Sequence, residues 1–404
     1  MKTVAIICEY NPLTNGHVRH LTSAREQTGC DTVVCVMSGS FVQRGEAAIT
    51  DKYSRASTAV FLGADIVVEL PLIYAISPAD NFAYGAIKTI AAFPDVEYIS
   101  FGSECGDAEL LTKVAMLLIE EPLELKNLLQ GFLKDGYSFP KARALAVDEY
   151  AGLNENYSEI KGLLDFPNNI LGIAYISAII KAGLDIKIHT IKRMGAGYND
   201  DAFDTEFPSA TAIRSAIRQG DLAKIKQYVP AETFSELLQL NEQVKSSTDP
   251  LDSLSDMIIF KLKGMSGHDL EHYYDVSGGL NNRIKLAAST TTTLDQLLEA
   301  AKTKRYTVAR LRRICLYALF DITKEMYEEA VRSPAYIEII AISSKRKDIL
   351  AALSESCRNV LTRFSDVNRV DKSLRVLVKL DFVAQGTLDI INRADKFNRK
   401  MIIV

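Results

Sequence analysis

Val4-Ala-Ile-Ile-Cys-Glu-Tyr-Asn-Pro-Leu-Thr-Asn-Gly-His-Val-Arg-His20 is the stretch of sequence that decides the fold. The apolar run from Val4 to Cys8 is β-branched at three of its five positions, which predicts a buried parallel strand. Turn-forming residues over 11–16 end this strand, and a helix is expected to begin near His17. Because the first turn of a helix has free N–H groups at the positive end of the helix dipole, the stretch predicts an anion site. A phosphate group is the expected ligand.

A second phosphate-binding pattern occurs much later in the chain, as Ser209-Ala-Thr-Ala-Ile-Arg214. The hydroxyl groups of Ser209 and Thr211 lie at the expected start of a helix, where hydroxyls bind phosphate oxygens. Arg214 follows one turn later and would neutralise charge on a leaving pyrophosphate. A Ser-x-Thr pattern alone is usually only a helix cap, so this pattern gains weight only together with the first one.

Buried strands and amphipathic helices alternate between the two patterns. The expected strands cover residues 31–37, 66–70, 98–104 and 185–191, and the expected helices cover 17–28, 51–62, 79–92 and, after a helix-rich stretch from 107, a last one from 167 to about 181. This alternation predicts an α/β fold with a parallel, doubly wound sheet. In such a sheet, loops at the carboxyl ends of the strands line the ligand crevice.

Two of these loops offer candidates for substrate contact. Gln43 and Arg44 lie in the loop 38–46 and are candidates for contact with substrate or phosphate. The alternative is a loop that is simply solvated. Gly102 comes at the end of a later strand, where a residue without a side chain lets the backbone approach a flat ligand such as adenine. The alternative for Gly102 is a plain glycine at a strand end.

The last two crevice segments carry polar and basic residues. Asn168 or Asn169 can cap the helix that begins there. The loop 192–198 contains Arg193 and two glycines, and its basic residues suit a triphosphate.

The second part of the chain has a different pattern. The alternation is lost over 220–248, and we recognise no convincing β-branched run beyond it until the last residues. A length of 404 residues also favours more than one domain. We therefore expect domains at 1–235 and 236–404, the second built of helices, for example 252–263, 294–302, 307–322 and 346–355.

Composition sets further limits. The apolar fraction of 48% allows substantial cores, and the net charge of −4 argues against a generally basic nucleic-acid binder. The six cysteines form no C-x-x-C pair, so neither a zinc site nor a disulfide framework is indicated, and a reducing cytoplasm fits. We find no signal segment and no apolar run long enough for a membrane helix.

A local basic stretch lies at 302–313, Lys-Thr-Lys-Arg-Tyr-Thr-Val-Ala-Arg-Leu-Arg-Arg, which contains six basic residues and no acidic one. Tyr306 interleaves with the charges, so phosphate neutralisation and base stacking can be combined in an RNA-binding segment. The alternative is a helix with a solvated basic face.

The motifs together resemble a known family. Thr14-Asn-Gly-His17 is similar to the (His/Thr)-x-Gly-His signature of the nucleotidyltransferase superfamily, and 209–214 is similar to its second signature, Ser-Ser-Thr-x-Ile-Arg. Nearly the whole chain resembles the bacterial tRNA(Met) cytidine acetate ligase family, through Glu9-Tyr-Asn-Pro12, the loop 38–46, Phe101-Gly-Ser-Glu104, Pro167-Asn-Asn-Ile170 and Lys304-Arg-Tyr-Thr307.

This resemblance implies a fold and an activity. The fold is a Rossmann-like nucleotidyltransferase domain that binds ATP and acetate, followed by a mainly α-helical C-terminal domain that helps hold tRNA. The activity is that of an ATP-dependent ligase. Such an enzyme forms acetyl-adenylate and pyrophosphate from acetate and ATP, and then acetylates the wobble cytidine of elongator tRNA(Met) to give N4-acetylcytidine.

The resemblance also assigns site residues. Catalytic roles fall on Thr14, His17, Ser209, Thr211 and Arg214, which would stabilise charge on the phosphates together with Mg²⁺. ATP-binding roles fall on Gly102, Asn168 or Asn169, Arg193, and the segment Ile7, Cys8, Glu9, Tyr10, Asn11, Pro12, Leu13, Thr14, Asn15, Gly16, His17, Val18, Arg19 and His20. No residue is assigned as a metal ligand. Many family members have a histidine in place of Thr14, so here a hydroxyl would contact the phosphate.

Three other functions compete with this interpretation. The first is an adenylyltransferase that joins AMP to a phosphorylated small molecule, although such compact enzymes do not need a long helical extension. The second is a binding protein without chemistry, which would not need both signatures. The third is acetyl transfer from acetyl-CoA, for which we find no typical pyrophosphate loop.

Overall fold

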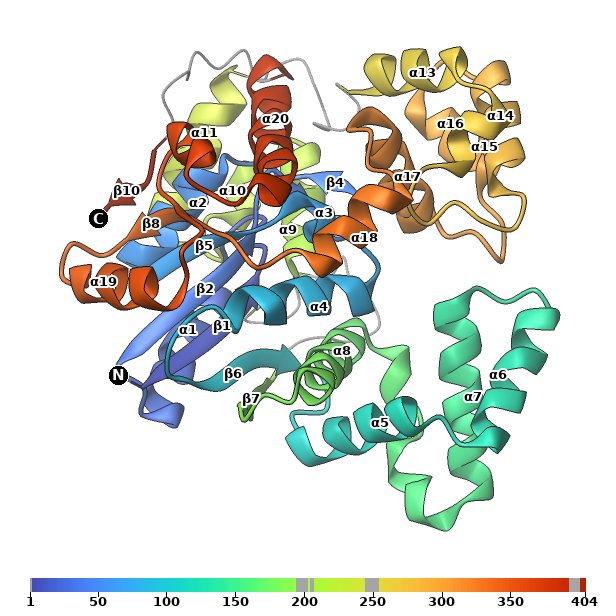
Figure 1. Cartoon of the computed structure of the whole chain (residues 1–404), viewed down its shortest axis with the longest axis horizontal. Coiled ribbons are helices and arrows are strands. Elements are labelled where there is room, and N and C mark those ends of the chain that lie inside the picture. Colours follow the sequence, from blue (N-terminus) through green and yellow to red (C-terminus); the bar gives the residue numbers. More distant parts are fainter. Residues whose placement is uncertain (1, 194–202, 204–206, 244–253, 392–399) are drawn as a thin grey trace.

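The computed structural model describes residues 2–193, 203, 207–243, 254–391 and 400–404 (Figure 1). At its centre is an eight-stranded sheet, in which β9 (Val360–Leu361) pairs with β8 beside the main path of seven strands. Along that path the order is β10 (Ile402–Ile403), β8 (Ile337–Ile342), β5 (Ile66–Leu70), β2 (Thr32–Ser38), β1 (Thr3–Cys8), β6 (Val96–Ser103) and β7 (Lys187–Lys192). Among these described strands every neighbouring pair is parallel except β5 with β8.

The strands and helices predicted for the first half of the chain are confirmed, with bounds that differ by two residues or fewer. The loop 38–46 additionally forms a small hairpin of β3 (Phe41–Val42) and β4 (Glu46–Ala47). The helices and turns are α1 (Asn15–Thr28), α2 (Lys52–Phe61), α3 (Leu72–Ala75), α4 (Ala79–Ile90), α5 (Ala108–Glu120), α6 (Leu123–Lys134), α7 (Phe139–Leu153), η1 (Glu155–Ile160), η2 (Leu163–Asp165), α8 (Pro167–Ala182), α9 (Ala210–Arg218) and α10 (Leu222–Ile225).

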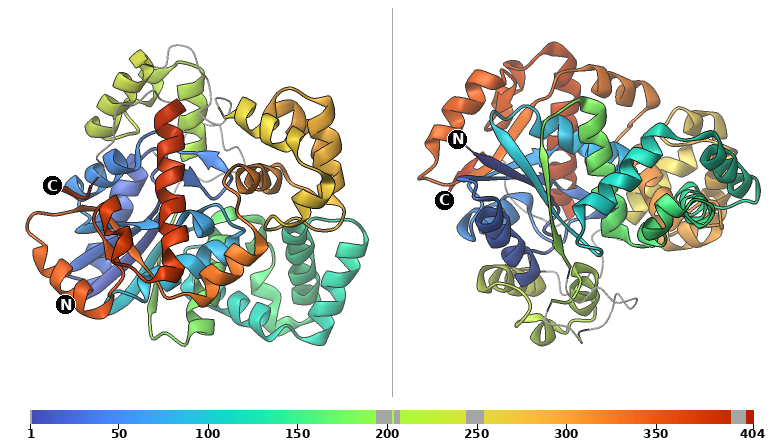
Figure 2. Two further views of the ribbon diagram at one scale, coloured as in Figure 1. Left: turned by 45° about the horizontal axis from the view of Figure 1, so that its top comes forward. Right: turned by 90° about the horizontal axis from the view of Figure 1, so that it is seen from below.

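Helices cover both faces of the sheet (Figure 2). Successive side chains of a strand point to opposite faces, and β1 divides accordingly. Val4 and Ile6 pack in a core with α1 and α2, whereas Ala5 and Ile7 pack in a larger core with α4 and α8. Burial on both faces explains why the sequence of β1 is a continuous apolar run.

The sheet order places a ligand crevice at one position. From β1 the chain builds outward through β2 and β5, and it then returns to the other side of β1 to add β6 and β7. The order therefore reverses between β1 and β6, and in open α/β sheets ligands bind beyond the carboxyl ends of the strands at such a switch point. Residues 9–17 follow directly after β1, and residues 102–104 lie at the carboxyl end of β6.

The region after residue 236 is mainly helical, as predicted, but the expectation that it holds no strand before the last residues is wrong. Residues 337–342 form β8, which pairs antiparallel with β5 of the first half, and β10 extends the same sheet. The helices and turns are α11 (Ala231–Gln243), α13 (Ser255–Gly264), α14 (Gly267–Glu271), α15 (Leu280–Thr290), α16 (Leu294–Ala301), α17 (Val308–Leu319), α18 (Lys324–Arg332), α19 (Lys347–Ser356), η3 (Phe364–Asn368), η4 (Lys372–Leu374) and α20 (Arg375–Ile391). The division at 235 and 236 stays a prediction.

Two helical groups project to one side of the sheet, α5 to α7 and α13 to α17 (Figure 1). Within the described ranges no single helix is long and apolar enough to cross a membrane, although the bent pair of 155–165 and α8 passes by length and composition. All six cysteines are free thiols.

Candidate active site

A cavity of 490 Å³ opens at the switch point between β1 and β6. Residues of both sequence signatures line it, together with residues of the strands β1, β3, β4 and β6. The residues that line it are Ile7, Cys8, Glu9, Tyr10, Asn11, His17, His20, Val42, Gln43, Arg44, Glu46, Phe82, Phe101, Gly102, Glu104, Asp165, Phe166, Pro167, Asn168, Leu171, Tyr175, Arg193, Phe207, Ser209, Ala210, Thr211 and Arg214.

The N-terminus of α1 forms one wall, and Thr14 and His17 organise it as a capping box. Thr14 is the N-cap residue, and its backbone N–H donates to His17 Nδ1 at 3.0 Å. An Nδ1 atom that accepts a hydrogen bond carries no proton, so the ring proton of neutral His17 is on Nε2. Burial, Arg193 and His20 lower the pKa of His17 to about 3. His17 is thus a neutral N–H donor.

The N-terminus of α9 forms the opposite wall. Ser209 caps this helix by accepting the N–H of Ala212 at 3.0 Å. Arg214 donates from Nη2 to Thr211 Oγ1 at 3.1 Å and from Nη1 to the carbonyl oxygen of Asn11 at 2.9 Å. The second signature is therefore hydrogen-bonded to the loop that precedes the first signature, and the predicted helix start at Ser209 is confirmed.

The N-terminus of α8 reaches the cavity from a third side, but the prediction that an asparagine caps it is wrong. Phe166 is the N-cap residue, and the orphan N–H groups of Asn168 and Asn169 donate to the Glu104 carboxylate at 3.2 and 2.8 Å. Asn169 is buried and accepts the N–H of Glu104 and of Cys105 through Oδ1. Asn168 is the asparagine that lines the cavity.

Gly102 near the end of β6 and Arg193 directly after β7 lie together at the cavity. A Cβ atom on Gly102 would approach Arg193 Cγ to 3.2 Å, so a side chain here would require a small shift of the arginine side chain. Arg193 Nη1 donates to Asn168 Oδ1 at 3.4 Å. Of the predicted loop 192–198, residues 194–198 lie outside the described residues.

His20 belongs to a hydrogen-bonded chain that runs away from the cavity. Its Nε2 is 2.9 Å from Ser100 Oγ, which is 2.9 Å from His189 Nδ1, and His189 Nε2 is 3.0 Å from Gln27 Oε1. Burial, His189 and Arg193 lower the pKa of His20 to about 4, so this chain is neutral near pH 7.

Several residues of the predicted ATP segment do not line the cavity. Leu13 packs in the core with α1 and α2, and Asn15 ties α1 to the chain after α10 by donating to the Gln227 carbonyl at 2.9 Å. The others outside the cavity lining are Pro12, Thr14, Gly16, Val18 and Arg19. These residues shape the loop and the helix start, and a direct contact with ATP stays a prediction for them.

Sequence reasoning missed Arg55, which holds the strand ends in place. Its buried guanidinium group donates to the carbonyl of Glu9 at 2.6 Å, to that of Ser38 at 3.0 Å and also to that of Gly39. It thereby joins the ends of β1 and β2. A fourth carbonyl partner, that of Thr50, is close in sequence, but the three partners at the strand ends are remote, so no local pattern predicts this role.

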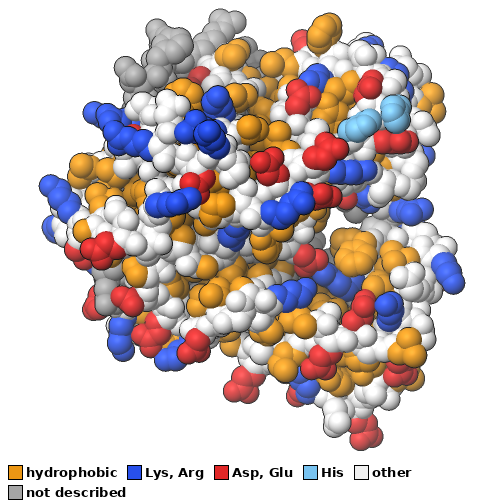
Figure 3. Space-filling model, in the orientation of Figure 1, with side chains coloured by type: hydrophobic (Ala, Val, Ile, Leu, Met, Phe, Trp, Pro, Cys, Tyr) orange, Lys and Arg blue, Asp and Glu red, His pale blue; other side chains and the backbone are white. Residues whose placement is uncertain are grey.

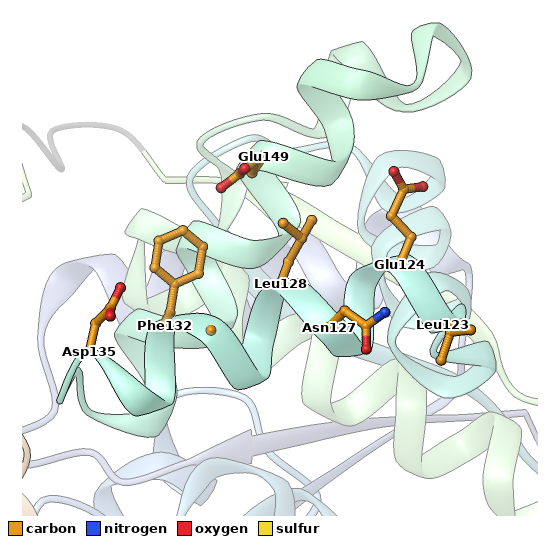
Figure 4. Close-up of a pocket in the computed structure, with 8 residues that line it drawn as sticks. Leu123, Glu124, Asn127, Leu128, Phe132, Asp135 and Glu149 are labelled. Carbon is orange, nitrogen blue, oxygen red and sulfur yellow. The ribbon is translucent and has the colours of Figure 1, made fainter.

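A second hollow, of 730 Å³, lies along α6 (Figure 4). Its lining includes the carboxylates of Glu124, Asp135 and Glu149 but no lysine, arginine or histidine. Such a surface repels a nucleotide. Among the described residues no group of three or more histidine, cysteine or acidic side chains is placed to hold a metal ion.

The basic stretch 302–313 is only partly exposed, so base stacking by Tyr306 is not supported. Tyr306 is buried and donates to the carbonyl of Gly278. Arg310 pairs with Asp275 at 3.0 Å, and Arg313 is buried. Lys304 is exposed, with Nζ 3.4 Å from the ring centroid of Tyr137. On the face drawn in Figure 3, basic and acidic side chains are interspersed.

The fold and these three helix termini define the class: the chain belongs to the HIGH nucleotidyl transferase family, whose model matches residues 1–401. Within that class it belongs to the tRNA(Met) cytidine acetate ligase family. A relative of that name from Caldanaerobacter subterraneus subsp. tengcongensis is 43% identical over 357 residues, which are 88% of this chain and 86% of the relative. One from Clostridium perfringens is 34% identical over 411 residues, 100% and 98% of the two chains.

A solved structure agrees with this membership. The crystal structure of Thermotoga maritima TmcAL bound with α-thio ATP superposes with a TM-score of 0.88 at 33% sequence identity, and the match covers 100% of both chains. The apo form of the same protein gives a TM-score of 0.90. The Rossmann-like nucleotidyltransferase fold predicted from the sequence is confirmed.

Proposed function

We propose that this protein is an ATP-dependent tRNA(Met) cytidine acetate ligase, which forms acetyl-adenylate from acetate and ATP and acetylates the wobble cytidine of elongator tRNA(Met). The observation that carries the proposal is the meeting of both signatures in one cavity, where Arg214 donates to the carbonyl of Asn11. Membership of the family of that name supports the choice of substrates.

In the first step an acetate oxygen attacks the α-phosphorus of ATP in line with the departing pyrophosphate. His17 offers a neutral Nε2–H to the phosphates, and Arg214 offers a guanidinium charge beside Thr211. The helix N-termini of α1 and α9 add oriented N–H groups. Acetate is already ionised near pH 7, so this step needs positioning and charge stabilisation rather than proton removal.

Adenosine is best accommodated by the end of β6. Gly102 leaves room beside Arg193, and Asn168 lies at the α8 terminus that Glu104 caps. Mg²⁺ would enter with the triphosphate, because the described residues supply no cluster of acidic ligands for a resident ion.

In the second step the exocyclic amine of cytidine attacks the acetyl carbonyl carbon, and AMP leaves. The base has to leave the anticodon stack in order to reach the cavity. We assign tRNA contact to the helical C-terminal region, where the exposed basic residues of 302–313 are Lys302, Lys304 and Arg305.

Omission of single substrates tests this proposal. The protein is incubated with ATP, labelled acetate and elongator tRNA(Met), and each is left out in turn while pyrophosphate, AMP and N4-acetylcytidine are measured. We expect pyrophosphate to require ATP and acetate, and N4-acetylcytidine to require all three. Efficient acetylation from acetyl-CoA without ATP would contradict the proposal, and so would transfer of AMP to a phosphorylated small molecule.

A further inference from the structure

The second step of the proposed reaction releases a proton from the cytidine amine, and the cavity contains four carboxylates that are candidates to take it. Three of them are poorer candidates. Glu104 accepts the first N–H groups of α8 with both oxygens, Glu46 pairs with Arg312 and Arg214, and Asp165 is an exposed side chain that pairs with Lys141 at 3.2 Å.

Glu9 is the fourth carboxylate, and only one of its oxygens is engaged. Its Oε1 accepts the backbone N–H of Gln43 at 2.8 Å, which orients the group. No donor within the described part of the chain bonds to Oε2. This oxygen is nevertheless not shut off from solvent. Because Glu9 lines the cavity, Oε2 is reachable by a bound substrate.

The backbone at Glu9 is also held in place by hydrogen bonds. Its backbone carbonyl accepts a hydrogen bond from the buried Arg55, which locks the end of β1. The next residues of the chain lead to Asn11, whose carbonyl is bound by Arg214. The free oxygen therefore belongs to a rigid segment between the two phosphate-binding helix starts.

The histidines of the cavity are poorer candidates. His17 Nδ1 is occupied by the Thr14 N–H, and its Nε2 carries the proton. His20 Nε2 bonds to Ser100 on the side of His189 and Arg193, and its pKa of about 4 makes it a weak base.

We propose that Glu9 is the general base of acetyl transfer to cytidine. The cytidine N4 nitrogen forms a bond to the acetyl carbonyl carbon, the bond from that carbon to the AMP phosphate oxygen breaks with its electron pair on the oxygen, and one N4 proton passes to Glu9 Oε2. The inference rests on the proposed function.

The surroundings of Glu9 suit this role. Burial raises the pKa of its carboxyl group, while the Gln43 N–H and the guanidinium groups of Arg214, Arg44 and Arg55 oppose that rise. A carboxylate whose pKa is raised by burial is a stronger base than an exposed one. The neighbouring Cys8 and Tyr175 stay neutral, because burial raises the pKa of both.

Glu9→Gln is the informative variant, because the amide oxygen can still accept the Gln43 N–H while the basic oxygen is lost. Synthetic acetyl-adenylate and elongator tRNA(Met) are supplied to the protein, and N4-acetylcytidine is measured in single turnovers from pH 5.5 to 8.5. We expect the wild-type rate to rise with pH and then level off. The variant is expected to be slower by about 10² to 10⁴ and to lose this pH dependence.

Three companion measurements separate a base from a structural residue. Pyrophosphate release from ATP and acetate by Glu9→Gln is expected to fall much less than acetyl transfer, because acetate needs no base. Glu9→Asp keeps a carboxylate and is expected to retain the pH dependence at an intermediate rate. Glu97→Gln, a matched change at the far end of β6 where Glu97 pairs with Lys187, is expected to behave as wild type.

Equal loss of both steps in Glu9→Gln, or a wild-type pH profile, overturns the role of Glu9 as base. A wild-type protein that makes no N4-acetylcytidine from acetyl-adenylate overturns the proposed function itself. The two failures are therefore distinguishable in one set of reactions.

Discussion

Arg214 Nη1 donates a hydrogen bond of 2.9 Å to the backbone carbonyl of Asn11, so one contact joins the loop after the first strand to the helix that begins at Ser209. The same guanidinium group bonds to Thr211 and lies 3.9 Å from Glu46. Arginine is suited to this position because its planar group has several fixed donors, which a lysine ammonium lacks.

Arg214→Lys is therefore expected to slow pyrophosphate release from ATP and acetate by at least about tenfold, although the charge is kept. Pyrophosphate release under saturating ATP is the measurement. Arg332→Lys, on an exposed helix where the arginine pairs with Glu328, is the matched control and should change nothing. A fully active Arg214→Lys would show that the bond to Asn11 is dispensable.

His17→Ala is expected to slow formation of acetyl-adenylate by about two orders of magnitude, since it removes a donor to the phosphates. It also removes the acceptor for the Thr14 N–H, so the free energy of unfolding should fall by about 1 kcal/mol. Because the pKa of His17 is about 3, the wild-type rate of this step should show no histidine titration between pH 6 and 8. An inflection near pH 6.5 that disappears in His17→Ala would contradict neutral His17.

Exposed and buried members of the basic stretch 302–313 should behave differently. Replacing Lys304 and Arg305 by alanine is expected to weaken tRNA binding and to reduce the slope of log affinity against log salt by about 2, one unit for each lost phosphate contact. Replacing Arg310 and Arg313 is instead expected to lower the thermal stability, because Arg310 pairs with Asp275 and Arg313 is buried. Unchanged affinity and slope in the first variant would place the tRNA surface elsewhere.

Asp381 on α20 provides a pH-dependent test of the fold. It accepts the N–H of Leu72 at 2.7 Å and the hydroxyl of Tyr336, and burial together with Glu338 raises its pKa to about 7. A carboxyl group whose pKa is raised in the folded state favours folding at low pH, and this contribution is lost as pH rises through 7. The free energy of unfolding should therefore fall by up to about 1 kcal/mol from pH 6.5 to 8.5.

Urea unfolding of the wild type and of Asp381→Asn at these two pH values measures this contribution. The variant should lose less stability with rising pH than the wild type. An identical fall in both proteins would show that Asp381 does not titrate in this range.

Local pattern was sufficient for most of the first half of the fold and insufficient for β8. The run Ile337–Ile342 is short, and a short apolar run does not distinguish a strand from a buried helix segment. It becomes a strand because it pairs with β5, whose partner residues Ile66 and Val67 are far away in the sequence. No pattern within a short window contains that pairing.

The sequence by itself determined the strand, turn and helix around Thr14 and His17, the helix start at Ser209 and the family, because each depends on residue types at short spacing. Only the tertiary structure decided that Asn168 rather than Asn169 lines the cavity, and that Glu9 keeps one free oxygen. These properties depend on which distant groups fill the remaining hydrogen-bonding positions and exclude water. Such partners are brought together by packing, which local periodicity does not encode.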